Sequence, residues 1–144
     1  ISQARVDAIA GREGFSAVPY RDATGWSIGF GHFILPNEHF TSITRAQGME
    51  LLAQDTAKAS AAVSRLVTVP LNTNQHDALT SFTYNAGIGD FQNSTLLRML
   101  NAGDYSGAAN QFAFWDKSHT PSGNFVTNLS LDARRASEKA QFLA

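Results

Sequence analysis

Apolar residues follow two different periods along the chain, and the change between them divides the sequence. Residues 2–13 place Val6, Ile9 and Ala10 at helical spacing. Over residues 18–34 the pattern alternates with period two, which is typical of a strand. We therefore predict an N-terminal helix followed by a region of strand and turn.

The alternating stretch divides into a filled face and a nearly bare face. The filled face carries Trp26, Ile28, Phe30, His32 and Ile34. The opposite face carries Ser27, Gly29, Gly31 and Phe33. Glycine within a strand lets a ligand approach the backbone closely, so the bare face is a candidate binding surface. Ala23, Thr24 and Gly25 suit a tight hairpin turn, in which Gly25 is free to take a positive φ.

Helical periodicity returns after this region. Thr44 and Gln47 have the spacing of a capping box, which predicts a long helix that runs to about Val67. Further helices are expected over about 74–86, 94–102, 106–115 and 130–143. Their aromatic side chains are expected in the core, namely Phe82, Tyr84 and Phe112.

The ends of these helices are marked by residues with known preferences for helix ends. Ser94 and Ser130 are expected to be N-caps, and Gly87 and Gly103 are expected to end helices. The segment 118–128 is predicted to be the longest loop of the second half.

Composition and charge limit the possible partners. A length of 144 residues fits one compact domain with two lobes. The formal charge of -1 creates no strong attraction to nucleic acid, so we expect no nucleic-acid partner. The chain lacks cysteine, which excludes a thiolate nucleophile. No apolar run approaches the roughly 20 residues that a membrane-spanning helix needs.

The first residue is Ile1 and not methionine. The N-terminus also lacks the charged and then apolar layout of a secretory signal peptide. We therefore expect a processed product or a domain of a longer protein, without a signal peptide in this chain.

Two carboxylates, Glu13 and Asp22, stand with eight residues between them, around the predicted helix end and hairpin. Glycoside hydrolysis uses such a pair, because one acid protonates the leaving oxygen while the other activates water or attacks the sugar. The residues by themselves therefore predict a glycosidase.

Signals for other kinds of site are weak. His32, Glu38 and His39 lack the HExxH spacing of a zinc site, so we expect no metal, and His32 is expected to be structural. The pair Gly29 and Gly31 lacks the third glycine and the following helix of a dinucleotide site. No cofactor is expected.

The stretch from Glu13 to His32 combines the two acids with a characteristic string of residues. The string is Glu13-Gly14, Tyr20, Asp22, Gly25 and Trp26-Ser27-Ile28-Gly29-Phe30-Gly31-His32. In this combination it resembles the N-terminal signature of the phage-type lysozymes, glycoside hydrolase family 24. Matching runs continue over residues 43–47, 71–79, 81–87, 93–97 and 100–105, at Trp115, and at Arg134, Arg135 and Glu138. The resemblance therefore spans nearly the whole chain.

This resemblance implies an α+β, mainly helical lysozyme-like fold in a single domain over residues 1–144. Its parts would be a small β-hairpin lobe over about 14–40, a long connecting helix over about 44–67, and a helical lobe over about 71–144. A cleft would lie between the two lobes.

The resemblance also implies roles for individual residues. Glu13 would be the general acid, Asp22 the second catalytic carboxylate, and Ser27 the counterpart of a threonine that family members use beside the catalytic water. The sugar-contacting positions of the family map onto Phe33, Tyr84, Asn85, Ser94 and Gln111. Of these, Asn85 and Gln111 are expected to bond acetamido groups.

Two departures from the family pattern affect Ser27. The turn between Asp22 and Ser27 is one residue shorter than the family commonly has. A change of one residue sends alternate side chains to opposite faces unless the turn type compensates, and we expect compensation. Serine also lacks the methyl group that restricts a threonine side chain, so we expect water to be less well oriented.

The implied activity is hydrolysis of the bond between N-acetylmuramic acid and N-acetylglucosamine in bacterial peptidoglycan, by an inverting course. We expect a monomer that acts on the cell wall, in the periplasm or at the cell surface, as a phage lysis or virion-associated protein. A lytic transglycosylase, which needs only Glu13, and a non-enzymatic peptidoglycan-binding or scaffold domain stay open as alternatives. The presence of Asp22 argues against both.

Overall fold

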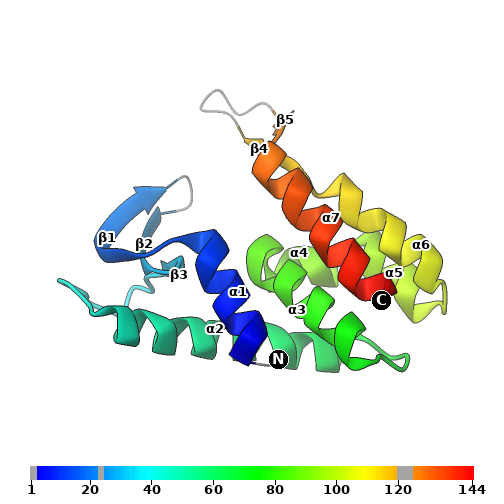
Figure 1. The fold of residues 1–144 in the computed structure, drawn as a ribbon, viewed down its shortest axis with the longest axis horizontal. Coiled ribbons are helices and arrows are strands. Elements are labelled where there is room, and N and C mark those ends of the chain that lie inside the picture. The colour runs from blue at the N-terminus through cyan, green and yellow to red at the C-terminus, as the bar shows by residue number, and fades with distance from the viewer. Residues whose placement is uncertain (1–2, 23–24, 120–124) are drawn as a thin grey trace. The chain divides into compact units, whose positions relative to one another are not determined.

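The computed structural model describes residues 3–22, 25–119 and 125–144, with the backbone alone for residues 22, 118–119 and 125–127. The chain divides into two compact units, Ile1–Lys58 and Ala59–Ala144. Helices dominate, with a three-stranded sheet in the first unit and a two-stranded sheet in the second (Figure 1). The predicted α+β, mainly helical fold class is confirmed. The predicted single domain with a cleft stays a prediction.

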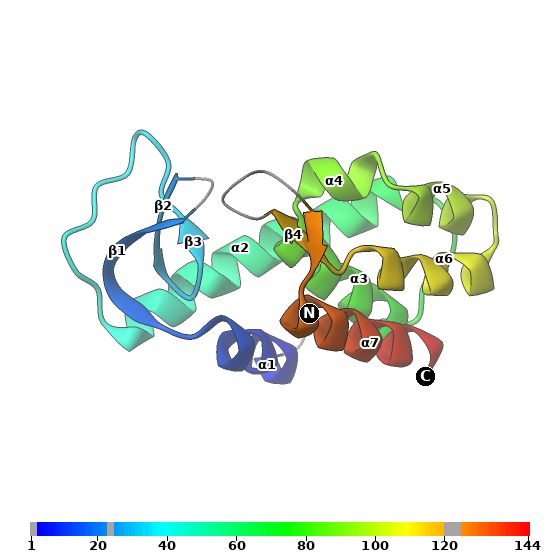
Figure 2. The ribbon, with the colours of Figure 1, turned by 90° about the horizontal axis from the view of Figure 1, so that it is seen from above.

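The first unit begins with helix α1 (Gln3–Glu13) and continues into an antiparallel sheet in the order β1-β2-β3 (Figure 2). The strands are β1 (Ser16–Asp22), β2 (Gly25–Gly29) and β3 (His32–Phe33). The predicted apolar face of α1 is confirmed, because Val6, Ile9 and Ala10 are all buried.

The prediction of one continuous alternating strand up to residue 34 was wrong. Strand β2 ends at Gly29, and the chain reverses before β3. Gly29 and Gly31 have φ of 70° and 91°, a region that side chains with a Cβ disfavour. These glycines therefore serve a turn and do not leave a strand face bare. Trp26, predicted on the filled face, is 51% exposed, whereas Ile28 on that face is fully buried.

Strand β1 contains an irregularity in its pairing with β2. Ser16 pairs with Gly29 and Tyr20 with Ser27, so four steps along β1 match two along β2. Pro19 lies in this irregular stretch of β1. Proline has no N–H, and here the regular pairing with β2 is interrupted, so no hydrogen bond between the strands is lost. The bulge is tolerated because β1 is an edge strand.

Helix α2 (Arg45–Leu66) begins at the predicted capping box. The Gln47 N–H donates to the Thr44 hydroxyl at 3.1 Å, and the Thr44 N–H donates to the Gln47 side chain at 2.8 Å. Residues 45–58 of α2 belong to the first unit. There a Cβ on Gly48 would lie 2.7 Å from the Phe15 ring, so glycine allows close packing between α2 and that ring.

Besides residues 59–66 of α2, the second unit contains two longer helices, α3 (Thr73–Ala86) and α7 (Leu129–Leu143), which lie side by side in Figure 1, and several short helices. Its elements are α3 (Thr73–Ala86), α4 (Ile88–Gln92), α5 (Thr95–Asn101), α6 (Tyr105–Gln111), a short 3₁₀ helix (Phe112–Phe114), β4 (Lys117–His119), β5 (Phe125–Thr127) and α7 (Leu129–Leu143). Phe82 is central to the core, with ring centroids 5.5 Å from Phe112 and 5.4 Å from Trp115. The expected core positions Phe82 and Phe112 are fully buried, whereas Tyr84 is half-buried.

The predicted helix ends of the second unit are partly confirmed. Ser94 caps α5, and both Gly87 and Gly103 take positive φ at helix ends. The Ser130 cap was wrong, because the side chain of Asn128 accepts from the Leu131 N–H and α7 starts earlier. Asparagine is as good an N-cap as serine, so residue preference does not distinguish Asn128 from Ser130 as the cap.

Three further features of the second unit differ from the prediction. The helix expected over 106–115 ends at Gln111 and tightens into a 3₁₀ turn. The segment expected to be a loop over 118–128 includes β5 and part of β4, which pair antiparallel, and its residues 120–124 lie outside the described residues. Helix α4 was not predicted, because one and a half turns are too short to show a period.

Candidate active site

Glu13 is the last residue of α1 and is half-buried. Gly14 follows with φ of 69°, and its N–H donates to the Ala10 carbonyl at 3.2 Å. A residue in the left-handed region ends a helix, so the chain turns directly after Glu13 toward β1. The sequence prediction that Glu13 lies at a helix end is therefore confirmed.

The register of the β1–β2 hairpin relates positions 22 and 27. Asp22 pairs with Gly25 across a two-residue connection, and Tyr20 pairs with Ser27. Paired residues share a face, and so do alternate residues of one strand. Positions 20, 22, 25 and 27 therefore share one face of the sheet. Ala23 and Thr24, the predicted turn residues, lie outside the described residues, so compensation within the turn stays a prediction. The side chain of Asp22, the predicted second carboxylate, lies outside the described residues.

Ser27 occupies the middle strand, between Tyr20 on β1 and Phe33 on β3. Ser27 is only 4% exposed, whereas Phe33 is 45% exposed. A Cβ on Gly25 would lie 3.0 Å from the Phe33 ring, so this ring leans over the glycine at the turn. An exposed aromatic ring in this row is compatible with the predicted sugar contact at Phe33.

His32, on the opposite face, belongs to an ion cluster. Its Nδ1 lies 2.7 Å from Asp55 Oδ2 and its Nε2 lies 2.9 Å from Glu38 Oε1. Burial acts to lower the pKa of His32, but the hydrogen bonds and charges of Asp55 and Glu38 outweigh it and raise the pKa. The Leu35 N–H, with His32, lowers the pKa of Glu38. Both ring nitrogens are occupied, which is the structural role predicted for His32.

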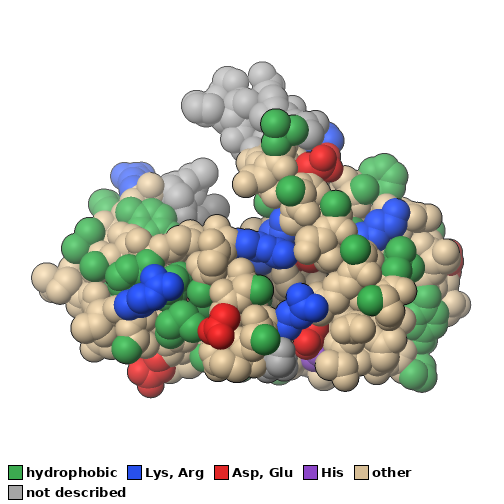
Figure 3. All heavy atoms as spheres, in the orientation of Figure 1, with side chains coloured by type: hydrophobic (Ala, Val, Ile, Leu, Met, Phe, Trp, Pro, Cys, Tyr) green, Lys and Arg blue, Asp and Glu red, His purple; other side chains and the backbone are tan. Residues whose placement is uncertain are grey.

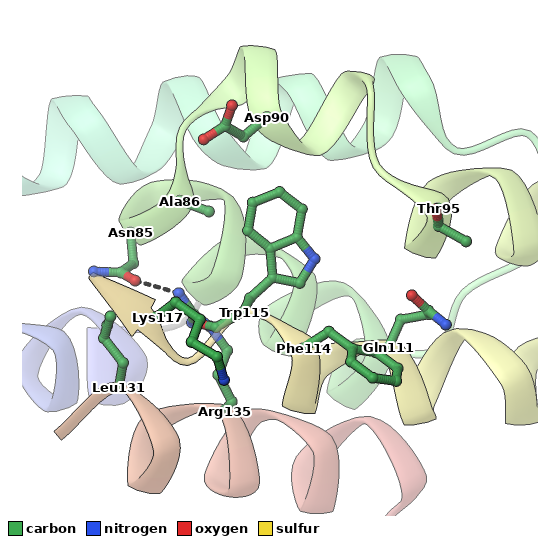
Figure 4. A pocket seen from close by; sticks show the side chains of 10 residues that line it. All are labelled: Asn85, Ala86, Asp90, Thr95, Gln111, Phe114, Trp115, Lys117, Leu131 and Arg135. Carbon is green, nitrogen blue, oxygen red and sulfur yellow. Dashed lines mark hydrogen bonds between the residues drawn. The ribbon is translucent and has the colours of Figure 1, made fainter. Parts of the chain in front are cut away.

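A pocket of about 770 Å³ lies within the second unit (Figure 4). Its walls are formed by Asn85, Ala86, Asp90, Thr95, Gln111, Phe114, Trp115, Lys117, Leu131 and Arg135. Two of the predicted sugar contacts, Asn85 and Gln111, line it, and the indole of Trp115 stands between them in Figure 4. The volume falls in the range of ligand sites, and six of the ten lining residues are polar or charged.

Ser94, another predicted sugar contact, is 3% exposed, and its hydroxyl is occupied. It donates to the Phe91 carbonyl at 2.7 Å and accepts from the Leu97 N–H at 3.0 Å. These bonds cap α5, so the geometry favours a structural role over a ligand contact. The contacts at Ser94 and at the half-buried Tyr84 stay predictions.

Arg135 is a pocket residue to which the sequence pattern assigned no role. Its Nε donates to the Trp115 carbonyl at 2.9 Å, and its two terminal nitrogens donate to Glu138 and to Asn85. The guanidinium also lies 4.8 Å from the centroid of the Phe82 ring. The available signal was the spacing of Arg135 and Glu138, which places both on one face of a helix.

Two features are absent from residues 3–22, 25–119 and 125–144, a metal-binding group and a membrane-spanning helix. No group of three or more His, Cys, Asp or Glu in this part is arranged to hold a metal ion. The helices found there are too short or too polar to cross a membrane. The expectation of no metal and no cofactor stays a prediction.

Known proteins resemble the chain over its full length. It is 37% identical to an endolysin of Acyrthosiphon pisum secondary endosymbiont phage 1, over 99% of this chain and 97% of that protein. It is 36% identical to an endolysin of Bacillus phage B103, but spans only 54% of that longer protein. The muramidase domain of SpmX from Asticaccaulis excentricus superimposes with a TM-score of 0.88 at 36% identity, covering 100% of this chain and 97% of that one.

The sequence model of the family described as phage lysozyme matches residues 10–138. The match includes the positions of Glu13, Asp22 and Ser27 and those of the pocket. Together with identities above a third over nearly complete lengths, it identifies the family and not only the fold. The chain therefore belongs to the phage lysozyme family and is a lysozyme-type glycoside hydrolase.

Proposed function

We propose that the chain hydrolyses the glycosidic bond between N-acetylmuramic acid and N-acetylglucosamine in bacterial peptidoglycan, with Glu13 as the general acid. The observation that carries this conclusion is the match to the phage lysozyme family over residues 10–138. Relatives named as endolysins and a muramidase domain favour hydrolysis over transglycosylation or binding alone.

In the proposed mechanism Glu13 donates a proton to the leaving sugar oxygen while Asp22 activates water on the other side of the ring. The face shared by positions 22 and 27 supports a role for Ser27 beside this water. The inverting course follows the family resemblance and stays part of the proposal.

The substrate contacts are proposed for two groups of residues. Phe33 offers an exposed ring on the sheet, and Asn85 and Gln111 offer polar groups on the pocket wall. An aromatic ring face packs on the apolar face of a pyranose, while side-chain amides bond acetamido groups. Tyr84 is proposed as a further contact, whereas the hydroxyl of the buried Ser94 caps α5.

The oligomeric state and the place of action are part of the proposal. We propose a monomer that acts on the bacterial wall from the periplasm or the cell surface and needs no nucleic-acid partner. Basic and acidic side chains are interspersed on the face that Figure 3 draws. With a formal charge of -1, long-range attraction to the anionic wall is weak, so binding depends on contacts within the site.

The test compares wild-type protein with Glu13→Gln and Asp22→Asn on purified peptidoglycan, with mass spectrometry of the product ends. Each substitution removes a proton donor or acceptor and is expected to lower kcat by about two to four orders of magnitude. Reducing ends are expected in the products. Anhydro ends would contradict hydrolysis, and an intact wall with retained binding would contradict an enzyme.

Asp22→Asn also tests the pairing of the two acids. If only Glu13→Gln lost activity, the proposed role of Asp22 would be wrong. The anomeric configuration of the first product separates an inverting from a retaining course.

A further inference from the structure

Asn85 lies at the end of α3, with one side of its amide held by the protein. Its Oδ1 accepts a hydrogen bond from the Arg135 guanidinium, drawn as a dashed line in Figure 4. Arginine has only donors, so the amide oxygen must be the atom that faces it, and the amide cannot be flipped without losing this bond. The nitrogen of Asn85 points away from Arg135 in Figure 4.

Arg135 is itself rigidly held. It is 2% exposed and bonds Glu138, the Trp115 carbonyl and Asn85 while its guanidinium lies over the Phe82 ring. Ser81 fixes the other end of this chain of contacts by donating to Glu138 at 2.6 Å. A planar, fully bonded guanidinium leaves the Asn85 amide one favourable orientation.

The Asn85 amide presents a hydrogen-bond donor, and no acceptor, to a ligand in the pocket. Asn85 is exposed and lines the pocket, and within the described part of the chain its Nδ2 has no hydrogen-bond partner. When the amide oxygen is hydrogen-bonded to arginine, only the amide nitrogen faces a ligand, and it can only donate a hydrogen bond. A ligand group that bonds it must therefore be an acceptor.

We infer that Arg135 is a positioning residue that holds the oxygen of Asn85 and leaves its amide nitrogen as a fixed donor to an amide carbonyl oxygen of the bound peptidoglycan. This inference rests on the proposed function for its substrate. Peptidoglycan offers such carbonyls in the acetamido groups of the sugars and in the stem peptides. The structure assigns the shared chemistry, an amide carbonyl, to this rim of the pocket.

The test uses Asn85→Asp and Asn85→Ala in the inactive Glu13→Gln background and measures binding to purified peptidoglycan sacculi by sedimentation. Asn85→Ala loses the donor and is expected to weaken binding by about tenfold. Asn85→Asp keeps an oxygen for Arg135 but turns an acceptor toward the carbonyl. It is expected to bind more weakly than Asn85→Ala, by about threefold or more.

A purely structural role predicts the opposite order. If Asn85 only supported Arg135, the aspartate would preserve that contact and Asn85→Asp would bind better than Asn85→Ala. That order would overturn the inference. The melting temperature of Asn85→Asp is expected to be no lower than that of Asn85→Ala, because the new carboxylate pairs with Arg135.

Asn74→Asp is the matched control for charge, because Asn74 is exposed near the other end of the same helix. It is expected to bind like the parent, and an equal loss in this variant would attribute the effect to charge and overturn the inference. Repeating the comparison at about 0.5 M salt screens long-range repulsion from the wall. The order of the two Asn85 variants is expected to persist there.

Glycan strands stripped of stem peptides by an amidase distinguish the two sources of the carbonyl. A penalty in Asn85→Asp that persists on stripped strands assigns the bond to an acetamido group, and a penalty that disappears assigns it to a stem peptide. Both results support the donor role. Failure of the proposed function is seen separately, as absence of lysis by wild-type protein or retained lysis by Glu13→Gln.

Discussion

Each unit of the chain contains an ion cluster around one buried side chain, and the two clusters have opposite charge patterns. In the first unit the His32 ring lies between two carboxylates, those of Asp55 and Glu38. In the second unit the Glu138 carboxylate lies between two guanidiniums, with Arg134 Nε at 3.4 Å from Glu138 and Arg135 in direct contact.

The two clusters differ in how they respond to pH. The histidine cluster contains a group that titrates near neutrality, whereas arginine keeps its charge throughout the ordinary pH range. The histidine cluster joins β3 to α2 and a nearby loop, while the arginine cluster also reaches Asn85 in the pocket. Asn85 in the pocket is therefore held by an arginine, whose charge stays constant over the ordinary pH range.

The largest expected effect comes from breaking the arginine cluster. Glu138→Gln keeps the shape of a 2% exposed side chain but leaves two buried guanidiniums without their counter-charge. The free energy of unfolding is expected to fall by about 3–5 kcal/mol, measured by denaturant titration. Glu50→Gln, an exposed carboxylate on α2, is the control and should change it by less than about 0.5 kcal/mol. A similar loss in both variants would contradict the importance of burial.

A smaller effect is expected from the histidine cluster. His32→Gln removes hydrogen bonds to two charged groups and is expected to cost about 2 kcal/mol at pH 6, measured by denaturant titration. The cost should be smaller at pH 8 than at pH 6. A cost that stayed constant between these pH values would contradict a protonated His32 at pH 6.

The direction of this pH dependence follows from the two shifts. The pKa of His32 is raised above 6.5, so its contribution is full below 6.5 and is lost as pH rises through the raised value. The pKa of Glu38 is lowered from 4.5, so its contribution is full above 4.5 and is lost as pH falls through the lowered value. The cluster therefore stabilises most between about pH 4.5 and 6.5.

The smallest effect is expected from the helix caps, one in each unit, which contain no charged group. Thr44→Ala removes half of the capping box of α2, and Asn72→Ala removes the matching box of α3, where Asn72 and Gln75 bond each other's backbone. Each is expected to cost about 1 kcal/mol by denaturant titration. Neither box contains an ionisable group, so equal costs at pH 6 and pH 8 are expected. A pH-dependent cost would show that the histidine cluster is not the source of the dependence.

Local signals in the sequence identified much of the fold. The Thr44 capping box, the glycine stops and the apolar face of α1 depend on residues within one or two turns, so they are visible without the fold. The short elements were missed for the same reason. Helix α4 and the β4–β5 pair are too short to show a period, and strand pairing depends on contacts distant in sequence.

The features of the candidate site also divide into those visible in the sequence and those that depend on the tertiary structure. The sequence by itself determined the family and placed Glu13 at a helix end, because both depend on the identity and spacing of residues. Only the tertiary structure decided three further points. The register of β1 and β2 places positions 22 and 27 on one face, the Ser94 hydroxyl caps α5, and Arg135 binds the oxygen of Asn85. Those three facts depend on hydrogen bonds whose geometry no spacing specifies, and the last of them joins residues fifty positions apart.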